Sequence, residues 1–318
     1  MTILHFARRQ GISKISERAI NLNLCGLYPL CGENSSRVVH ANTFRGHLWS
    51  VACVATKIKR AVAEHANSSL GKSLRCDARE WRFTVSTGRR IDMNGAAKDV
   101  LIPINAKAGV VSGLLLKPAN AKALLIFAHG AGAGMRHRFM EACAVNLAEH
   151  GIATLRYQFP YMEKRIKRPD AEATLTDTVR AAMTAAKKVA GNLPLFAGGK
   201  SMGGRMTSLA AAKEPLEDAR GLIFFGFPLH ALGKPGAERG AHLAAIKLPM
   251  LFLQGSRDGL ADLKLLKPLC KQLGKSVELF VVDGGDHSFH MLKSAKRTDD
   301  EVLNAITQKA ARWIGKNG

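Results

Sequence analysis

Short apolar runs alternate with longer segments of helical period from about residue 93 to the end of the chain. The clearest run, Ala123–Ala128, is apolar throughout and ends in His-Gly, which is typical of a strand buried on both faces of a parallel sheet. Similar runs end at glycine, proline or a polar turn: Thr154–Tyr157, Pro194–Gly198, Leu222–Gly226, Met250–Gln254 and Val277–Val282. This alternation predicts an α/β fold with a mainly parallel central sheet flanked by helices.

Two earlier strands and several helices complete this pattern. Val100–Ile104 and Val110–Leu116 are predicted to be strands, and the short connection between them favours an antiparallel pair. A helix is predicted at Met140–His150, which is followed by a glycine in the position of a C-terminal cap. The last helix is predicted to begin at Thr298, because Thr298 and Glu301 have the spacing of a capping box.

A pentad of the form Gly-x-Ser-x-Gly, residues 199–203, lies between an apolar strand and the helix-compatible segment 202–213. A serine on such a sharp turn has a strained backbone, and the residues two positions before and after it must be small for the strand and helix to approach. Gly199 and Gly203 meet that requirement. The pattern predicts a nucleophile elbow with Ser201 as the nucleophile.

A serine hydroxyl near neutral pH needs a base to take its proton and a carboxylate to orient that base. Asp258 follows the predicted strand 250–254, and His287 follows the predicted strand 277–282. Both therefore come at the carboxyl ends of strands, where the sites of open α/β sheets assemble. We predict that His287 takes the proton of Ser201 and that Asp258 orients His287.

Three neighbouring residues are alternatives for these two roles. Asp286 adjoins His287 in the sequence, so its side chain is expected to diverge from the imidazole. Asp262 is expected inside the helix that follows Asp258, as a surface carboxylate. His290 is an alternative base if the loop is longer than supposed.

Acyl transfer also needs donors for the developing oxyanion. The backbone N–H of Met202, directly after Ser201, is predicted to be one donor, and that of Ala131, in the glycine-rich loop 129–134, the other. The loop could instead bind phosphate, but it matches neither the P-loop pattern nor the dinucleotide-binding fingerprint. We therefore favour an oxyanion hole.

With these residues identified, the segment from about residue 100 to 313 resembles the small hydrolases related to dienelactone hydrolase. Within them it is most similar to the family that includes testis-expressed protein 30 and subunit 3 of the NSL chromatin complex. The resemblance rests on His129–Gly132, Arg156–Tyr161, Gly198–Gly203, Gln254–Asp258 and Gly285–His287. It implies an α/β-hydrolase fold and a triad of Ser201, Asp258 and His287. Dienelactone hydrolases proper have a cysteine nucleophile, which argues against lactone specificity here.

These observations predict a serine hydrolase that cleaves a small-molecule carboxylic ester or thioester through an acyl-enzyme, with no metal and no cofactor. The alternative is a catalytically silent hydrolase-like domain that serves as an interaction module, as the chromatin-complex relative suggests. No long lid insertion is obvious, which argues for a small or exposed acyl group. Residues 228–245 are the one candidate for a lid, and their glycines suggest mobility.

Residues 1–92 show no sustained period of 3.6 or 2 and match nothing in the family. They are interpreted as a poorly ordered basic extension, a targeting segment, or upstream sequence with the true start at Met93. The hydrolase domain is expected at residues 93–318. The segment also holds most of the cysteines: Cys25, Cys31, Cys53 and Cys76 out of 6 in the chain.

The chain carries a formal net charge of +22, which favours anionic neighbours without naming one. Its densest basic patch, residues 164–168, lacks interleaved aromatics and any groove-reading motif, so a solvated face is expected rather than a specific nucleic-acid site.

The apolar runs are shorter than the ~20 residues of a membrane helix. No Cys-x-x-C or zinc spacing occurs, and a reduced, cytoplasmic chain is expected. The oligomeric state is left open.

Overall fold

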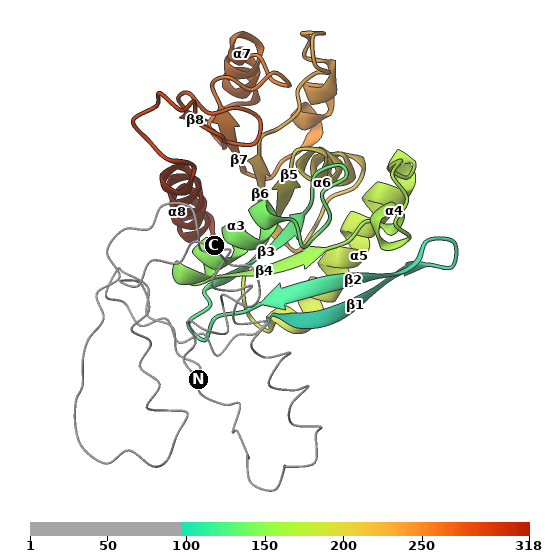
Figure 1. Ribbon diagram of the computed structural model, residues 1–318. Helices are drawn as coiled ribbons and strands as arrows, with labels where there is room; N and C mark the ends of the chain where they lie inside the picture. Colours follow the sequence, from blue (N-terminus) through green and yellow to red (C-terminus); the bar gives the residue numbers. More distant parts are fainter. Residues whose placement is uncertain (1–96) are drawn as a thin grey trace, which may run out of the picture. The chain divides into compact units, whose positions relative to one another are not determined.

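The computed structural model describes residues 97–318, and the expectations for residues 1–92 lie outside this range. An 8-stranded sheet forms the centre of this part, in the order β1-β2-β4-β3-β5-β6-β7-β8 (Figure 1). The strands are β1 (Lys98–Asn105), β2 (Gly109–Leu116), β3 (Ala123–Ala128), β4 (Ile152–Tyr157), β5 (Leu195–Lys200), β6 (Ala219–Phe225), β7 (Met250–Gly255) and β8 (Val277–Val282). β1 pairs with β2 and β2 with β4 in antiparallel fashion, and all other pairs are parallel.

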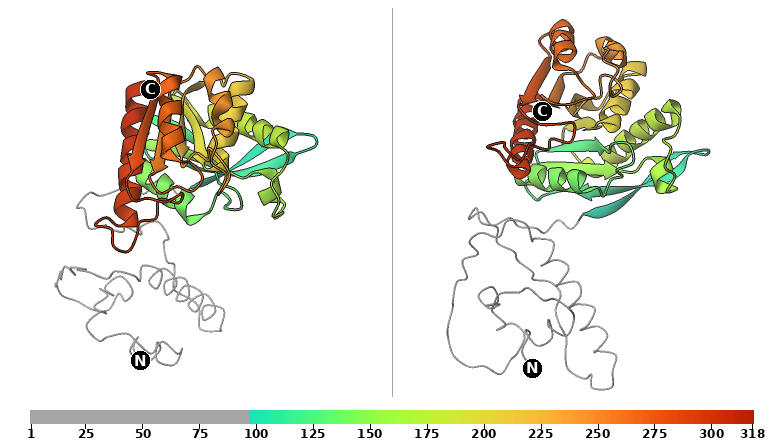
Figure 2. Two further views of the ribbon diagram at one scale, coloured as in Figure 1. Left: turned by 90° about the horizontal axis from the view of Figure 1, so that it is seen from above. Right: turned by 45° about the horizontal axis from the view of Figure 1, so that its top comes forward.

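Helices cover both faces of the sheet (Figure 2). They are α3 (Arg138–Glu149), α4 (Pro160–Glu163), α5 (Glu172–Ala190), α6 (Met202–Lys213), the 3-10 helix η2 (Glu238–Ala245), α7 (Leu263–Leu273) and α8 (Asp299–Asn317). Apolar side chains of α3 and α8 pack on one face of the sheet, and those of α5, α6 and α7 belong to the core on the other face. The predicted mainly parallel sheet with flanking helices is confirmed.

The continuous apolar run of β3 is explained by these two cores. Leu124, Ile126 and Ala128 belong to the core beneath α5 and α6, whereas the alternate residues Leu125 and Phe127 belong to the core beneath α3 and α8. Successive side chains of a strand point to opposite faces, so a strand covered on both sides must be apolar at every position. None of these residues is more than 1% exposed.

The last helix begins where the sequence predicts. Thr298 Oγ1 accepts a hydrogen bond from Glu301 N at 3.2 Å, and Thr298 N donates to Glu301 Oε2 at 2.7 Å, which completes the capping box. Trp313, near the other end of α8, packs so closely on Gly221 that a Cβ at that glycine would lie 2.5 Å from the indole. Within residues 97–318, none of the helices combines the length and apolarity that crossing a bilayer requires.

Several predicted element bounds need correction. β5 continues through Gly199 to Lys200, beyond the predicted end at Gly198. β6 begins at Ala219 instead of Leu222. Asp262 lies outside the helix interior: it is the N-cap of α7, where its Oδ1 accepts from Lys264 N at 2.8 Å. A short polar side chain at a helix start satisfies an otherwise unpaired N–H, which the apolar period alone does not reveal.

We expect Gly198→Ala to destabilise the protein by more than about 4 kcal/mol. A Cβ at Gly198 would lie 1.9 Å from the Ile223 carbonyl oxygen, which is held in the β5–β6 ladder and has no room to move. Gly315→Ala is the matched control, because a Cβ there meets nothing within 4 Å and lies in α8. It should stabilise the helix by about 0.5–1 kcal/mol. Denaturant unfolding measures both changes, and equal effects at the two positions would contradict the packing argument.

Candidate active site

Ser201 occupies a strained turn between β5 and α6. Its backbone has φ 50° and ψ −118°, a region of positive φ that non-glycine residues rarely adopt. Ser201 N donates a hydrogen bond to Phe225 O at 3.1 Å, which ties the turn to the end of β6. Strain of this kind persists only where the surroundings hold it, and it concentrates at functional sites.

The glycines on either side of the turn allow β3 to approach it. A Cβ at Gly199 would lie 2.6 Å from Ala128 O, and one at Gly203 would lie 2.5 Å from the same oxygen. Either side chain would displace the turn from the end of β3. The structure therefore has the close strand–turn–helix packing that the pentad predicts.

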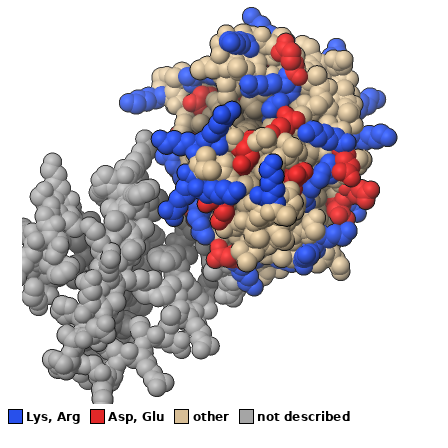
Figure 3. All heavy atoms as spheres, turned by 90° about the vertical axis from the view of Figure 1, so that its right-hand side faces the viewer, with Lys and Arg blue, Asp and Glu red and all other residues tan. Residues whose placement is uncertain are grey.

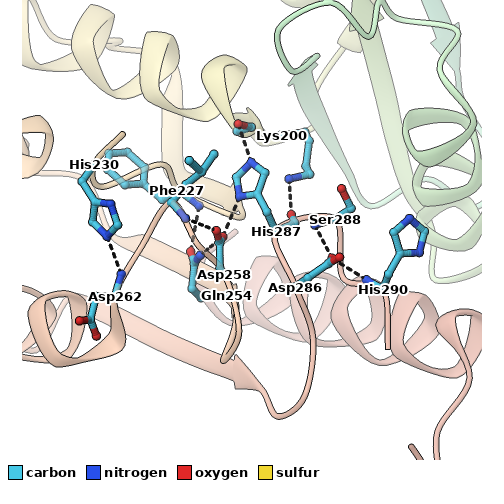
Figure 4. Close-up of polar contacts among 12 residues, drawn as sticks. Lys200, Phe227, His230, Gln254, Asp258, Asp262, Asp286, His287, Ser288 and His290 are labelled. Carbon is cyan, nitrogen blue, oxygen red and sulfur yellow. Dashed lines mark hydrogen bonds and ion pairs between the residues drawn. The ribbon is translucent and has the colours of Figure 1, made fainter. Parts of the chain in front are cut away.

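Three polar side chains from distant parts of the chain form a series of hydrogen bonds at this turn. His287 Nε2 lies 2.8 Å from Ser201 Oγ, and His287 Nδ1 lies 2.7 Å from Asp258 Oδ2 (Figure 4). An ionised carboxylate only accepts hydrogen bonds, so Nδ1 carries the proton and Nε2 is left to accept from the serine hydroxyl. The Asp258 side chain is fully buried, whereas His287 keeps 24% of its side chain exposed. The imidazole can therefore be reached from solvent.

The buried carboxylate of Asp258 is held by further donors. Gln254 Nε2 donates to Asp258 Oδ2, and Leu260 N donates to Oδ1 at 2.8 Å. Gln254 is oriented in turn because its Oε1 accepts from Phe227 N at 2.9 Å. These donors satisfy the carboxylate away from water. The sequence analysis did not assign this role to Gln254, although a polar residue at the end of an otherwise apolar strand is the signal that could have found it.

The three alternative residues have other partners. Asp286 Oδ1 accepts from the backbone N–H groups of Ser288 and His290, at 2.7 and 2.9 Å, and so closes its own loop. His290 Nδ1 lies 2.7 Å from Asp299 Oδ2, at the start of α8. Asp262 caps α7. The structure thus brings Asp258 and His287 to Ser201. The side chains of the three alternative residues form hydrogen bonds with other groups.

The loop after β3 runs beside Ser201. A Cβ at Gly130 would lie 3.7 Å from the Cβ of Ser201, in ordinary contact. Gly132 N donates to Tyr161 Oη at 3.0 Å. The N–H of Gly132 is therefore engaged, and that of Ala131 stays the predicted donor from this loop. Tyr161 was not predicted to hold the loop, and only the fold brings it there from α4.

His129 fixes the start of the same loop from inside the protein. Its side chain is fully buried, its Nε2 accepts from Phe159 N at 3.2 Å, and its Nδ1 lies 2.7 Å from Gly130 O. Burial lowers the pKa of His129 to about 4, against the raising effect of the hydrogen bond to the Gly130 carbonyl. His129 is therefore neutral near pH 7 and holds backbone groups in place.

The basic residues 164–168 follow α4 and are exposed. On the side of the molecule in Figure 3, Lys and Arg side chains are spread among Asp and Glu and do not form one continuous stripe. Glu163, directly before them, accepts from Ser112 N and Oγ at 3.0 and 2.8 Å. No group of three or more His, Cys, Asp or Glu side chains within residues 97–318 is arranged to hold a metal ion.

Solved structures with the same architecture are numerous. The dienelactone hydrolase of Anabaena variabilis ATCC 29413 superposes with a TM-score of 0.56 at 20% identity, covering 70% of this chain and 98% of that one. An alpha-beta serine hydrolase homologue from Coxiella burnetii gives 0.54 at 20% identity, covering 68% and 96%. A serine hydrolase without a lid from Xanthomonas campestris gives 0.53 at 20% identity, covering 68% and 94%. At these identities the likeness establishes the fold alone.

The α/β-hydrolase fold expected from the sequence is therefore confirmed, and Ser201 and His287 form a serine–histidine pair at the turn after β5. A family model described as "Alpha/beta hydrolase domain" matches residues 121–315. Since this match spans more than half of the chain, the chain belongs to the alpha/beta hydrolase domain family.

Proposed function

We propose that this chain is a serine hydrolase that cleaves a carboxylic ester or thioester through an acyl-enzyme. The observation that supports this most is the series Ser201 Oγ, His287 Nε2, His287 Nδ1 and Asp258 Oδ2, with spacings of 2.8 and 2.7 Å. Both spacings suit proton transfer from the serine to the imidazole and orientation of the imidazole by the carboxylate.

In the proposed reaction, Ser201 Oγ attacks the substrate carbonyl while His287 Nε2 takes the hydroxyl proton. Asp258 keeps the imidazole in the productive tautomer and stabilises the imidazolium. The backbone N–H groups of Met202 and Ala131 donate to the oxygen as it becomes negative. His287 then gives its proton to the leaving alcohol or thiol, which leaves the acyl group on Ser201. Water, activated by the same imidazole, releases the acid. These steps use protein groups and one water molecule, and they call for no metal or organic cofactor.

Residues 228–245, which follow β6, are held against neighbouring helices and do not form a long lid. This supports a substrate with a small or exposed acyl group. The segment is the candidate lid of the sequence analysis, and it is held in place: His242 Nε2 lies 2.7 Å from Ser208 Oγ of α6, and Arg239 donates to His230 O at 3.2 Å. Gly240 packs so closely on α7 that a Cβ would lie 2.6 Å from Leu269. Close packing on α7 therefore explains the glycine at position 240, and the segment need not be mobile to account for it.

Two finer assignments belong to the same proposal. The five motifs of the sequence analysis group the chain with testis-expressed protein 30 and NSL subunit 3, and they support a hydrolase domain over residues 93–318. Cytoplasmic residence is consistent with Cys143 and Cys270, which are free and buried.

A fluorophosphonate probe tests the proposal. The folded protein should take up one probe per chain, and peptide mapping should place it on Ser201, because only an activated serine reacts rapidly. Nitrophenyl esters and acyl-thioesters of increasing chain length, assayed on the same protein, then identify the preferred acyl group. Heat-unfolded protein is the control and should not react. Folded protein that takes up no probe and cleaves neither series would favour a silent interaction module.

A further inference from the structure

Lys200 has a contact that the proposed reaction does not use. It is the last residue of β5 and directly precedes Ser201. Its side chain turns inward, so the residue is 9% exposed. Lys200 Nζ donates to the backbone carbonyl of His287 at 2.6 Å (Figure 4). Lys200, next to Ser201 in the chain, is thus hydrogen-bonded to the backbone of His287.

Two aromatic rings hold the ammonium group in position. Lys200 Nζ lies 5.8 Å from the ring centroid of Phe139 and 5.7 Å from that of Phe289. The two rings are stacked, with centroids 5.9 Å apart and planes inclined by 10°. A cation within about 6 Å of a ring face is attracted by its quadrupole. The aromatic rings and the carbonyl together replace part of the water that the ammonium loses on burial.

The end of β6 leaves room for this contact. Gly226 has φ 70°, and a Cβ there would lie 3.0 Å from Lys200 Nζ and 3.1 Å from His287 O. A side chain at this position would therefore crowd both partners. Close packing therefore unites the carbonyl of His287, the ammonium of Lys200 and the backbone of Gly226, which has no side chain to crowd them.

We propose that Lys200 is a positioning residue, which holds the His287 carbonyl so that the imidazole stays within hydrogen-bond distance of Ser201. The inference rests on the proposed hydrolytic function. On the other side, Arg257 N donates to Gly285 O at 2.8 Å and anchors the same loop to the turn that carries Asp258. Lys200 supplies the anchor on the side of the nucleophile. A lysine that only filled space could be replaced by an apolar side chain without effect on activity.

The first test compares Lys200→Met with Lys200→Arg and with the control Lys213→Met, which removes an exposed lysine from α6. Lys200→Met should lower kcat/KM roughly 100-fold, through kcat, because a small misplacement of a reacting group has effects of that size. Lys200→Arg keeps the donors and should recover part of the loss. Lys213→Met should behave as wild type. The melting temperature of Lys200→Met should lie above the assay temperature, so that a loss of activity can be assigned to folded protein.

The pH dependence gives a second readout. Burial lowers the pKa of Lys200 to about 8, partly offset by the carboxylates of Asp258 and Asp286, and Cys143 also faces the ammonium. Cys143 is itself neutral, since burial raises its pKa. His137 also faces Lys200, and burial, Arg138 and Lys200 lower its pKa. The ammonium charge is present below about pH 8 and is lost above it. The neutral amine still donates to the His287 carbonyl but more weakly, so wild-type kcat/KM should fall there. The Arg variant, which remains charged, should not show this fall.

A spectroscopic signal separates this inference from the proposed function. The Nδ1 proton of His287, bonded to Asp258, should give a low-field proton NMR resonance in wild type and Lys213→Met. It should be broadened or lost in Lys200→Met, and in wild type above about pH 8. This comparison requires no substrate, so it remains valid if wild type cleaves no ester. An unchanged resonance, or a kcat/KM within about 3-fold of wild type, in folded Lys200→Met would overturn the role. Should that variant not fold, the Arg variant and the wild-type pH series decide.

Discussion

Ser201→Ala is expected to lower kcat for the best ester or thioester by about 10⁶-fold, the loss typical of removing the nucleophile from a serine hydrolase. The alanine cannot form the acyl-enzyme, and His287 Nε2, 2.8 Å from the hydroxyl in wild type, loses its reaction partner. KM should change little, because the hydroxyl contributes mainly to the transition state. Steady-state kinetics with active-site titration measures the effect, and the titration should detect no acylated variant.

Ser208→Ala is the matched control for this experiment. Ser208 Oγ also lies 2.7 Å from a histidine nitrogen, that of His242, but the residue is fully buried and lies within α6. Its removal should leave kcat within about 3-fold of wild type while it lowers stability by about 1–3 kcal/mol, because a buried hydrogen-bond partner is lost. Turnover that survived Ser201→Ala would instead show that another group carries the reaction.

Asp258→Asn is expected to lower kcat by about 10⁴-fold with little change in the fold. The carboxylate of Asp258 accepts from His287 Nδ1 at 2.7 Å and so leaves Nε2 unprotonated for Ser201. The amide of asparagine can turn its NH2 toward Nδ1, which places the imidazole proton on Nε2. A protonated Nε2 cannot accept the proton of Ser201. Kinetics over a pH series measures the loss.

Asp262→Asn is the control for the carboxylate. It makes the same chemical change a short distance along the chain, and asparagine retains the oxygen that caps α7. Its activity should be within about 2-fold of wild type, because Asp262 takes no part in the series of hydrogen bonds. Equal losses in the two variants would mean that charge near the site, and not the orientation of His287, sets the rate.

The local signals in the sequence were sufficient for the existence and order of the strands, the tight turn at Ser201 and the capping box at Thr298. Each of these signals depends on contacts between residues that are near in the chain. The signals are an apolar run, a pair of glycines around a serine, and the spacing of Thr298 and Glu301. The end of β5 was placed too early because glycines usually end strands, whereas Gly199 is there to admit Ala128 O from β3. That contact joins residues distant in the sequence, so the local pattern could not reveal it.

The supporting contacts of the site depend on long-range packing in the same way. Gln254 is oriented toward Asp258 by Phe227 N, which is 27 residues away in the chain, and Tyr161 reaches Gly132 because the parallel strands β3 and β4 end at the same edge of the sheet. Both side chains lie in motifs on which the family resemblance rests, but the spacing of those motifs assigns neither a chemical role. The proposed reacting groups were predicted from spacing, whereas the contacts that hold them required coordinates.

The attachment of η2 to α6 has a consequence for catalysis. Enzymes with hinged covers admit substrate by a slow opening motion, and that motion frequently limits their turnover. Here the segment above α6 is pinned through His242 and Ser208. For the proposed hydrolase, the approach of substrate and the departure of product then need no rearrangement of this segment.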